Sequence, residues 1–236
     1  MSSIFKDSEE NVKHGGVPVF QKDTPLFNPR DFTDGQHQVV GHCNGYTMEE
    51  RWKEETPLFK DIIIGQLKGD ETILDYGCGV GRLAKELIDA LPNLKVVGVD
   101  TSAEMRKLAE EYVNSDRFST KSPEELGNDK FNFTYCVYVL QHIPPAFIDN
   151  AIKQVSESSD RLLLVNSVAR MYASPEGFVN DGYDVLGEVA KYFGKAEWAV
   201  PSYDLINNPL IRKMFMGSVL AGTEGNTEHY AFLFER

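Results

Sequence analysis

The sequence has few of the features that mark several large classes of protein. Its three cysteines, Cys43, Cys78 and Cys136, are too few and too scattered for a disulfide framework, and their spacing fits no zinc site. The longest apolar run, Tyr135 to Leu140, has six residues, whereas a helix needs roughly 20 to span a bilayer. No repeat with a period of about 20 to 50 residues is present. These absences exclude disulfide scaffolds, apolar membrane-spanning helices and solenoids.

Basic residues are also in the minority. The 236-residue chain has 24 lysines and arginines against 36 aspartates and glutamates, a net charge of −12. Such a surface repels nucleic acids and anionic lipid, so we expect no nucleic-acid or membrane partner. The polar first sixteen residues and the few cysteines predict a cytoplasmic protein. The acidity is explained by solubility alone or, alternatively, by attraction of a cationic ligand.

From residue 72 onward, short apolar runs alternate with segments of helical periodicity. Apolar strands separated by helices indicate a parallel sheet covered on both faces, and therefore the α/β class. In the last part of the chain, 214–221 is an alternative strand. The expected strands are 72–76, 95–99, 117–120, 131–138, 162–168, 197–200 and 229–234.

The domain organisation is predicted from the same patterns. Prolines and glycines without a sustained period predict an N-terminal arm or cap over 1–56, followed by a core over 57–236. Thr47 with Glu50 forms a capping box that begins one helix, and Thr56 before Pro57 predicts the start of another. Residues 202–227 form a long insertion, which we expect to cover a binding site.

The segment from Leu74 to Arg82, with glycines at 77, 79 and 81, lies between a strand and a helix. Glycines permit positive φ and close approach of a ligand to the backbone, and a helix N-terminus offers free N–H groups. Asp100 follows the next strand, where an acid can hold a ribose diol. The turn therefore predicts a nucleoside site, and a tight turn without a ligand is the alternative.

The identity of the nucleoside follows from the spacing and the charge. The pattern is G-x-G-x-G, whereas dinucleotide sites have G-x-G-x-x-G. Asp75 precedes the first glycine by two residues, where a carboxylate repels a pyrophosphate and attracts an ammonium group. An amino-acid-bearing nucleoside therefore fits better than NAD, and a nicotinamide-dependent oxidoreductase is the less favoured alternative.

Three segments, LDYGCGVGRLA, VVGVDTSAEMRKLAEE and FNFTYCVYVLQHI, resemble motifs of the class I S-adenosylmethionine-dependent methyltransferases, of the small-molecule or general domain type. The resemblance covers about 46–168 and implies a doubly wound, mostly parallel seven-stranded Rossmann-like sheet whose last strand is antiparallel. It also implies S-adenosylmethionine as cofactor, S-adenosylhomocysteine as product and a small-molecule or peptide acceptor. A cofactor-binding but inactive subunit of a complex is the alternative function.

The resemblance further implies which residues bind the cofactor. Asp75, Gly77 and Gly79 would line its methionine part, and Asp100 would take the ribose hydroxyls. Arg51 and Trp52 would close over the cofactor, or are ordinary packed helix residues. The full set is Tyr46, Arg51, Trp52, Asp75, Gly77, Cys78, Gly79, Asp100, Thr101, Met105, Ser122 and Tyr138, in which Thr101 and Met105 border the adenine and Ser122 replaces an acid near its amine.

Methyl transfer from a sulfonium is an in-line displacement that depends mainly on orientation and exclusion of water. A general base is needed only when the acceptor must lose a proton. His142, after the fourth expected strand, is the first candidate for this base, and His37 and His42 are the next candidates. The alternative for His142 is a structural role in holding a loop. No metal site is expected, since His37, His42 and Cys43 match no usual ligand spacing.

Overall fold

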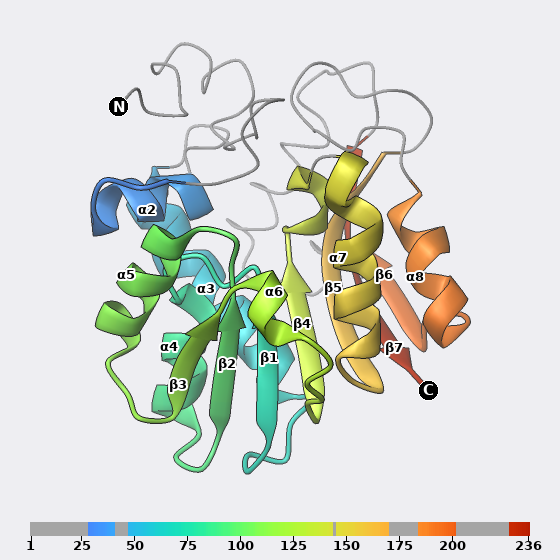
Figure 1. The fold of residues 1–236 in the computed structure, drawn as a ribbon, viewed down its shortest axis with the longest axis horizontal. Helices are drawn as coiled ribbons and strands as arrows, with labels where there is room; N and C mark the ends of the chain where they lie inside the picture. Colours follow the sequence, from blue (N-terminus) through green and yellow to red (C-terminus); the bar gives the residue numbers. More distant parts are fainter. Residues whose placement is uncertain (1–27, 41–46, 144, 170–183, 202–226) are drawn as a thin grey trace.

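The computed structural model describes residues 28–40, 47–143, 145–169, 184–201 and 227–236. Their strands form one seven-stranded sheet in the order β3-β2-β1-β4-β5-β7-β6 (Figure 1). The strands are β1 (Thr72–Tyr76), β2 (Lys95–Val99), β3 (Phe118–Lys121), β4 (Phe133–Val137), β5 (Arg161–Ala169), β6 (Trp198–Pro201) and β7 (Thr227–Glu235).

The pairing of the strands confirms the predicted fold class. β3, β2, β1, β4 and β5 are parallel to one another, and β7 is antiparallel to both β5 and β6. The chain order reverses between β1 and β4, which makes this pair the switch point of the sheet. Ligands of open α/β sheets bind outside the carboxyl ends of the strands at such a point.

Helices cover both faces of the sheet (Figure 1). One hydrophobic core lies beneath α3, α4 and α5 and includes Phe59, Ile63 and Leu87. The other lies beneath α6, α7 and α8 and includes Ile148 and Val189. The helices are α2 (Phe32–Val39), α3 (Met48–Ile64), α4 (Arg82–Ala90), α5 (Ala103–Val113), α6 (Pro123–Leu126), α7 (Pro145–Glu157) and α8 (Val185–Phe193), with a 3₁₀ turn η1 at Leu140–His142.

The prediction that a new helix begins at Thr56 is wrong. α3 begins with the capping box of Thr47 and runs without a break through Pro57. The Thr56 hydroxyl donates to the Trp52 carbonyl within the helix and does not cap a new one. A proline removes one helical hydrogen bond, but packing of Phe59 against the sheet core holds the helix together. The predicted boundary between arm and core therefore falls inside α3, and the division remains a prediction.

The last part of the chain is described only in pieces. β6 lies at 198–201, as the preferred interpretation predicted. The alternative strand at 214–221 and nearly all of the insertion predicted at 202–227 lie outside the described residues.

Candidate nucleoside site at the carboxyl edge of the sheet

The glycine turn connects β1 to α4 and has the backbone conformation that its sequence predicts. Gly77, Gly79 and Gly81 have φ of 81°, 52° and 79°, in the left-handed region that glycine tolerates best. The carbonyl of Val99, at the end of β2, accepts hydrogen bonds from the N–H groups of Gly77 (2.7 Å) and Cys78 (3.0 Å). A Cβ on Gly77 would lie 2.6 Å from Cγ1 of Val139. The turn is thus anchored to β2 and has no room for a side chain at Gly77.

Asp100 is hydrogen-bonded directly to this turn. One carboxylate oxygen accepts from the Gly79 N–H (3.0 Å), and the other accepts from the Ser102 N–H (2.9 Å). Burial raises the pKa of Asp100, and these two hydrogen bonds oppose the rise. Because a carboxylate has about four acceptor sites, each oxygen retains capacity for a further donor. The structure therefore brings together Gly79 and Asp100, which the sequence assigned to one site, with acceptors available for a diol.

Asp75 lies beneath the turn and is 5% exposed. Burial raises its pKa to about 7, the nearby Tyr135 hydroxyl acts in the opposite direction, and the charge of Asp100 adds to the rise. The Asp75 side chain is therefore partly protonated at neutral pH. This refines the sequence argument, which treated Asp75 as fully charged. A cation bound nearby would favour the ionised form.

Cys78, Met105 and Ser122 have clear structural environments. Cys78 is buried, burial raises the pKa of its thiol, and its Sγ lies against Gly98. Met105 is buried in the first turn of α5. Ser122 follows β3 and caps α6, where its hydroxyl accepts from the Glu125 N–H at 3.3 Å. All three lie near the carboxyl ends of the parallel strands, and their cofactor contacts remain predictions.

Thr101 is exposed in the bend after β2, and the N-cap of α5 is Ser102. The Ser102 hydroxyl accepts from the Met105 N–H at 3.1 Å. The helix therefore begins at Ser102, whose N–H is also bonded to Asp100.

Tyr138 directly follows β4 and has φ of 58°, which is uncommon for a residue with a side chain. Its N–H donates to the Val165 carbonyl at 2.7 Å, and its ring packs edge-on against Phe59 with the centroids 5.9 Å apart. Strained backbone of this kind often accompanies functional positions. Tyr138 thus lies next to the switch point in a conformation imposed by its surroundings, and its contact with a cofactor remains a prediction.

Helix α2 of the N-terminal arm lies over the glycine turn, at the end of the sheet to which β1, β2 and β4 point (Figure 1). A Cβ on Gly79 would lie 2.6 Å from Cγ2 of Val39, and a Cβ on Gly35 would lie 2.5 Å from Cγ1 of Val80. Gly35 and Gln38 are the buried residues of this helix. No local sequence pattern identifies Gln38, since its burial depends on this packing.

Arg51 and Trp52 belong to a buried cluster on α3 and α4. Nε of Arg51 lies 2.6 Å from Glu55, and its Nη1 donates to the Val40 carbonyl at the end of α2. Glu55 also pairs with Arg82 at 3.4 Å. Among described contacts, Arg82 lies over the Trp52 ring at 5.4 Å. Arg82 thus forms a buried ion pair with Glu55.

Trp52 packs edge-on against two further rings, Phe32 of α2 (6.3 Å between centroids) and Tyr112 of α5 (6.2 Å). These contacts favour the packed-helix interpretation of Trp52 over a direct cover for a cofactor. Tyr46, the remaining residue predicted to close the site, lies outside the described residues.

His142 ends η1 and is 8% exposed. Burial lowers its pKa to about 4. The imidazole is therefore neutral at neutral pH and is a weaker base than an ordinary histidine. Its role in catalysis remains a prediction.

In the five ranges that the structure covers, no three His, Cys, Asp or Glu side chains cluster as metal ligands would. Within the same ranges, no helix combines the length and apolar character needed to cross a membrane.

Comparison with known proteins agrees with this geometry. A family model described as "Methyltransferase domain" matches residues 73–159. An uncharacterized methyltransferase of Anoxybacillus flavithermus is 28% identical over 137 residues, 56% of this chain and 60% of the relative. This chain thus matches less than two thirds of the relative's length.

Two solved structures show the same fold. The [4+2]-cyclase SpnF superposes with a TM-score of 0.60 at 12% identity, covering 82% of this chain and 83% of that protein. Coclaurine N-methyltransferase, bound to N-methylheliamine and S-adenosylhomocysteine, superposes with a TM-score of 0.54 at 13% identity, covering 82% and 75%.

The fold is that of the class I, S-adenosylmethionine-dependent methyltransferases. The match to the methyltransferase-domain model covers residues 73–159, and this segment contains the glycine turn, Asp100 and His142.

Proposed function

We propose that this protein binds S-adenosylmethionine at the carboxyl edge of β1, β2 and β4 and transfers its methyl group to a small-molecule acceptor. The observation that supports this most strongly is the link between Asp100 and the Gly79 N–H. Through this hydrogen bond, a carboxylate that can accept from a ribose diol lies beside a turn that has no side chain at Gly77 or Gly79. Both are at the switch point of the sheet, where open α/β folds bind ligands. The coclaurine enzyme, on the same fold, holds S-adenosylhomocysteine.

The residues present fit such a cofactor. Asp100 would hold the ribose hydroxyls, and the turn at 77–79 would lie against the methionine part. Asp75 would favour the cofactor's ammonium group once ionised. When bound, S-adenosylmethionine supplies an electrophilic methyl group, so the chain's own contribution is to orient the two reactants and exclude water.

The proposed class of methyl acceptor is inferred from the net charge of the chain. A net charge of −12 disfavours nucleic acid and leaves a small molecule, or a peptide group, as the proposed acceptor. Where that acceptor must lose a proton, His142 is the proposed base, because it is neutral at neutral pH and follows β4 at the same edge.

Calorimetric titration with S-adenosylhomocysteine tests cofactor binding. We expect a dissociation constant in the micromolar range or tighter for the unaltered chain. In Asp100→Asn, the amide NH₂ takes the place of one carboxylate oxygen, so that two hydrogen-bond donors face each other. The negative charge of the carboxylate is lost as well. A hydrogen bond to a charged group contributes about 1.5 to 3 kcal/mol, so affinity should fall about 10- to 100-fold.

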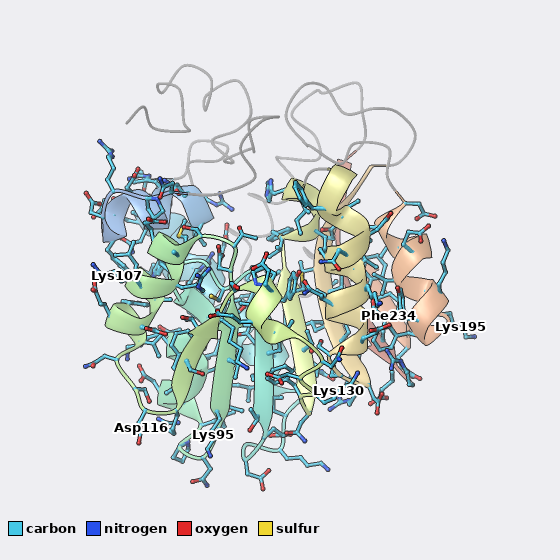
Figure 2. The ribbon with its side chains drawn as sticks, in the orientation of Figure 1. Lys95, Lys107, Asp116, Lys130, Lys195 and Phe234 are labelled. Atoms are coloured by element: carbon cyan, nitrogen blue, oxygen red, sulfur yellow. The ribbon has the colours of Figure 1, made fainter. Side chains whose placement is uncertain are left out.

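Asp116→Asn is the matched control. Asp116 is exposed at the opposite edge of the sheet, where Figure 2 shows it pointing away from the molecule near Lys95. The control should bind like the unaltered chain, and equal affinities for all three chains would remove Asp100 from the site. Binding without turnover on any acceptor would instead favour the inactive-subunit alternative.

A further inference from the structure

Gln38 of α2 has a buried side chain whose amide has no hydrogen-bond partner among the residues that the structure describes. The residue is 5% exposed, and neither Nε2 nor Oε1 forms a hydrogen bond with any of them. A buried polar group without a partner destabilises the folded state. Such groups are rare in folded proteins and need an explanation.

The position of Gln38 on α2 points to the glycine turn. Gly35, one helical turn before it on the same face, packs on Val80. Val39, the next residue, packs on Gly79. Gln38 therefore lies between the two contacts that join α2 to the turn, on the buried side of the helix.

The chemistry of the side chain limits what can satisfy it. A carboxamide has a donor and an acceptor side by side, and here both are unused. An α-amino acid group in its zwitterionic form offers a carboxylate to accept from Nε2 and an ammonium to donate to Oε1. This match involves only the amino-acid group of a ligand. It does not require a ribose or an adenine ring at the Asp100 end of the turn.

We propose that Gln38 is a binding residue for the amino-acid part of the cofactor, supplied by the N-terminal arm. This inference rests on the proposed function and adds to it a specific contact from outside the 73–159 domain. It also gives α2 a role beyond packing, since the arm then completes the cofactor site.

The test combines two ligands with two variants. Gln38→Met keeps the length of the side chain and removes both polar groups, and Gln36→Met makes the same change at a partly exposed position of the same helix. S-Adenosylhomocysteine carries the amino-acid group, and 5′-methylthioadenosine lacks it. We expect Gln38→Met to weaken S-adenosylhomocysteine about 10-fold or more in calorimetric titration, since a hydrogen bond to a charged group is lost, and to leave methylthioadenosine within twofold.

Thermal unfolding without ligand provides a second readout. Removal of an unsatisfied buried amide should leave the melting temperature of Gln38→Met unchanged or raise it. A side chain that only held α2 in place would instead lower it. Gln36→Met should leave both affinities unchanged.

The outcomes separate the inference from the proposed function. Equal weakening of both ligands, or unchanged binding of S-adenosylhomocysteine, in Gln38→Met would overturn the inference while cofactor binding stands. An unaltered chain that binds neither ligand would overturn the proposed function, and the inference with it. If Gln38→Met does not fold, Gln38→Glu serves in its place, because it keeps the shape but presents an anion to the carboxylate, and it must show the same selectivity between ligands.

Discussion

Charged side chains differ in solvent exposure between the carboxyl edge of the sheet and the opposite edge. At the carboxyl edge, Asp75 and Arg82 are buried or nearly so, and Asp100 is held by backbone N–H groups. At the other edge, charged side chains such as Lys95 and Asp116 extend into solvent (Figure 2). Burying a charge is costly unless it is paired or used. The contrast teaches that desolvated charge is concentrated where a ligand is proposed to bind.

The largest effect should come from breaking the buried Arg51–Glu55–Arg82 cluster. Glu55→Gln removes the carboxylate that pairs with the buried Arg82 and with the partly buried Arg51. Removal of one partner of a buried ion pair costs about 3 to 5 kcal/mol. Denaturant unfolding should show this loss in the free energy of unfolding.

The matched exposed pair is Lys85 and Asp89 on α4. Asp89→Asn should change stability by about 0 to 1 kcal/mol, as exposed pairs do. Similar losses in Glu55→Gln and Asp89→Asn would contradict the distinction between buried and exposed charge.

The second prediction concerns the pH dependence contributed by Asp75. Its pKa in the folded chain is about 7, against 3.8 ordinarily. Between these values the unfolded chain binds fewer protons than the folded one, so the stability contributed by Asp75 is lost as pH rises, by up to about 4 kcal/mol. Asp75→Asn cannot ionise, so its stability relative to the unaltered chain should increase from about pH 4 to pH 7 and then level off.

Unfolding free energies measured across this range check the prediction. The lowered pKa of His142 contributes in the opposite direction, with stability lost as pH falls from about 6.5 to 4, but it does so equally in both chains. Asp116→Asn should remain parallel to the unaltered chain. A constant difference between Asp75→Asn and the unaltered chain would mean that Asp75 titrates like a solvated aspartate.

The prediction with the smallest expected effect distinguishes backbone strain from steric clash at two glycines. Gly77→Ala forces both a positive φ and a clash with Val139, whereas Gly127→Ala forces a positive φ with open space around the new Cβ. An alanine in the left-handed region costs about 1 to 2 kcal/mol. Gly127 has φ of 54° and ψ of −124°, outside that region but also sparsely populated, and such positions cost about 1 to 3 kcal/mol. We expect that cost for Gly127→Ala and a larger one for Gly77→Ala, with S-adenosylhomocysteine binding weakened only by the latter. Equal stability losses would mean that the contact with Val139 relaxes freely.

Much of the core could be predicted from local patterns. Each expected strand from Thr72 to Phe234 has a counterpart within a few residues, because buried parallel strands are apolar throughout and their helices repeat with the helical period. The glycine turn and Asp100 were also predicted to share a site, since both follow strands at one edge of the sheet.

Failures occurred where distant packing overrode a local signal. Thr56–Pro57 has the sequence of a helix start, but the packing of Phe59 carries α3 through it. The pKa values of Asp75 and His142 depend on burial, which local spacing does not encode. The contacts of Arg82 and Gln38 likewise depend on helices that are separate in sequence.

The sequence by itself determined the α/β alternation, the left-handed glycine turn and the chemical types available at the edge of the sheet. These follow from side-chain periodicity and from the freedom of glycine at positive φ, which are properties of short segments. The tertiary structure alone decided which charged groups are desolvated. The reason is that α2 and α3, which precede the 73–159 domain in the chain, pack against the residues around the turn. Desolvation depends on everything packed around a group, and so it is settled only when the whole chain has folded.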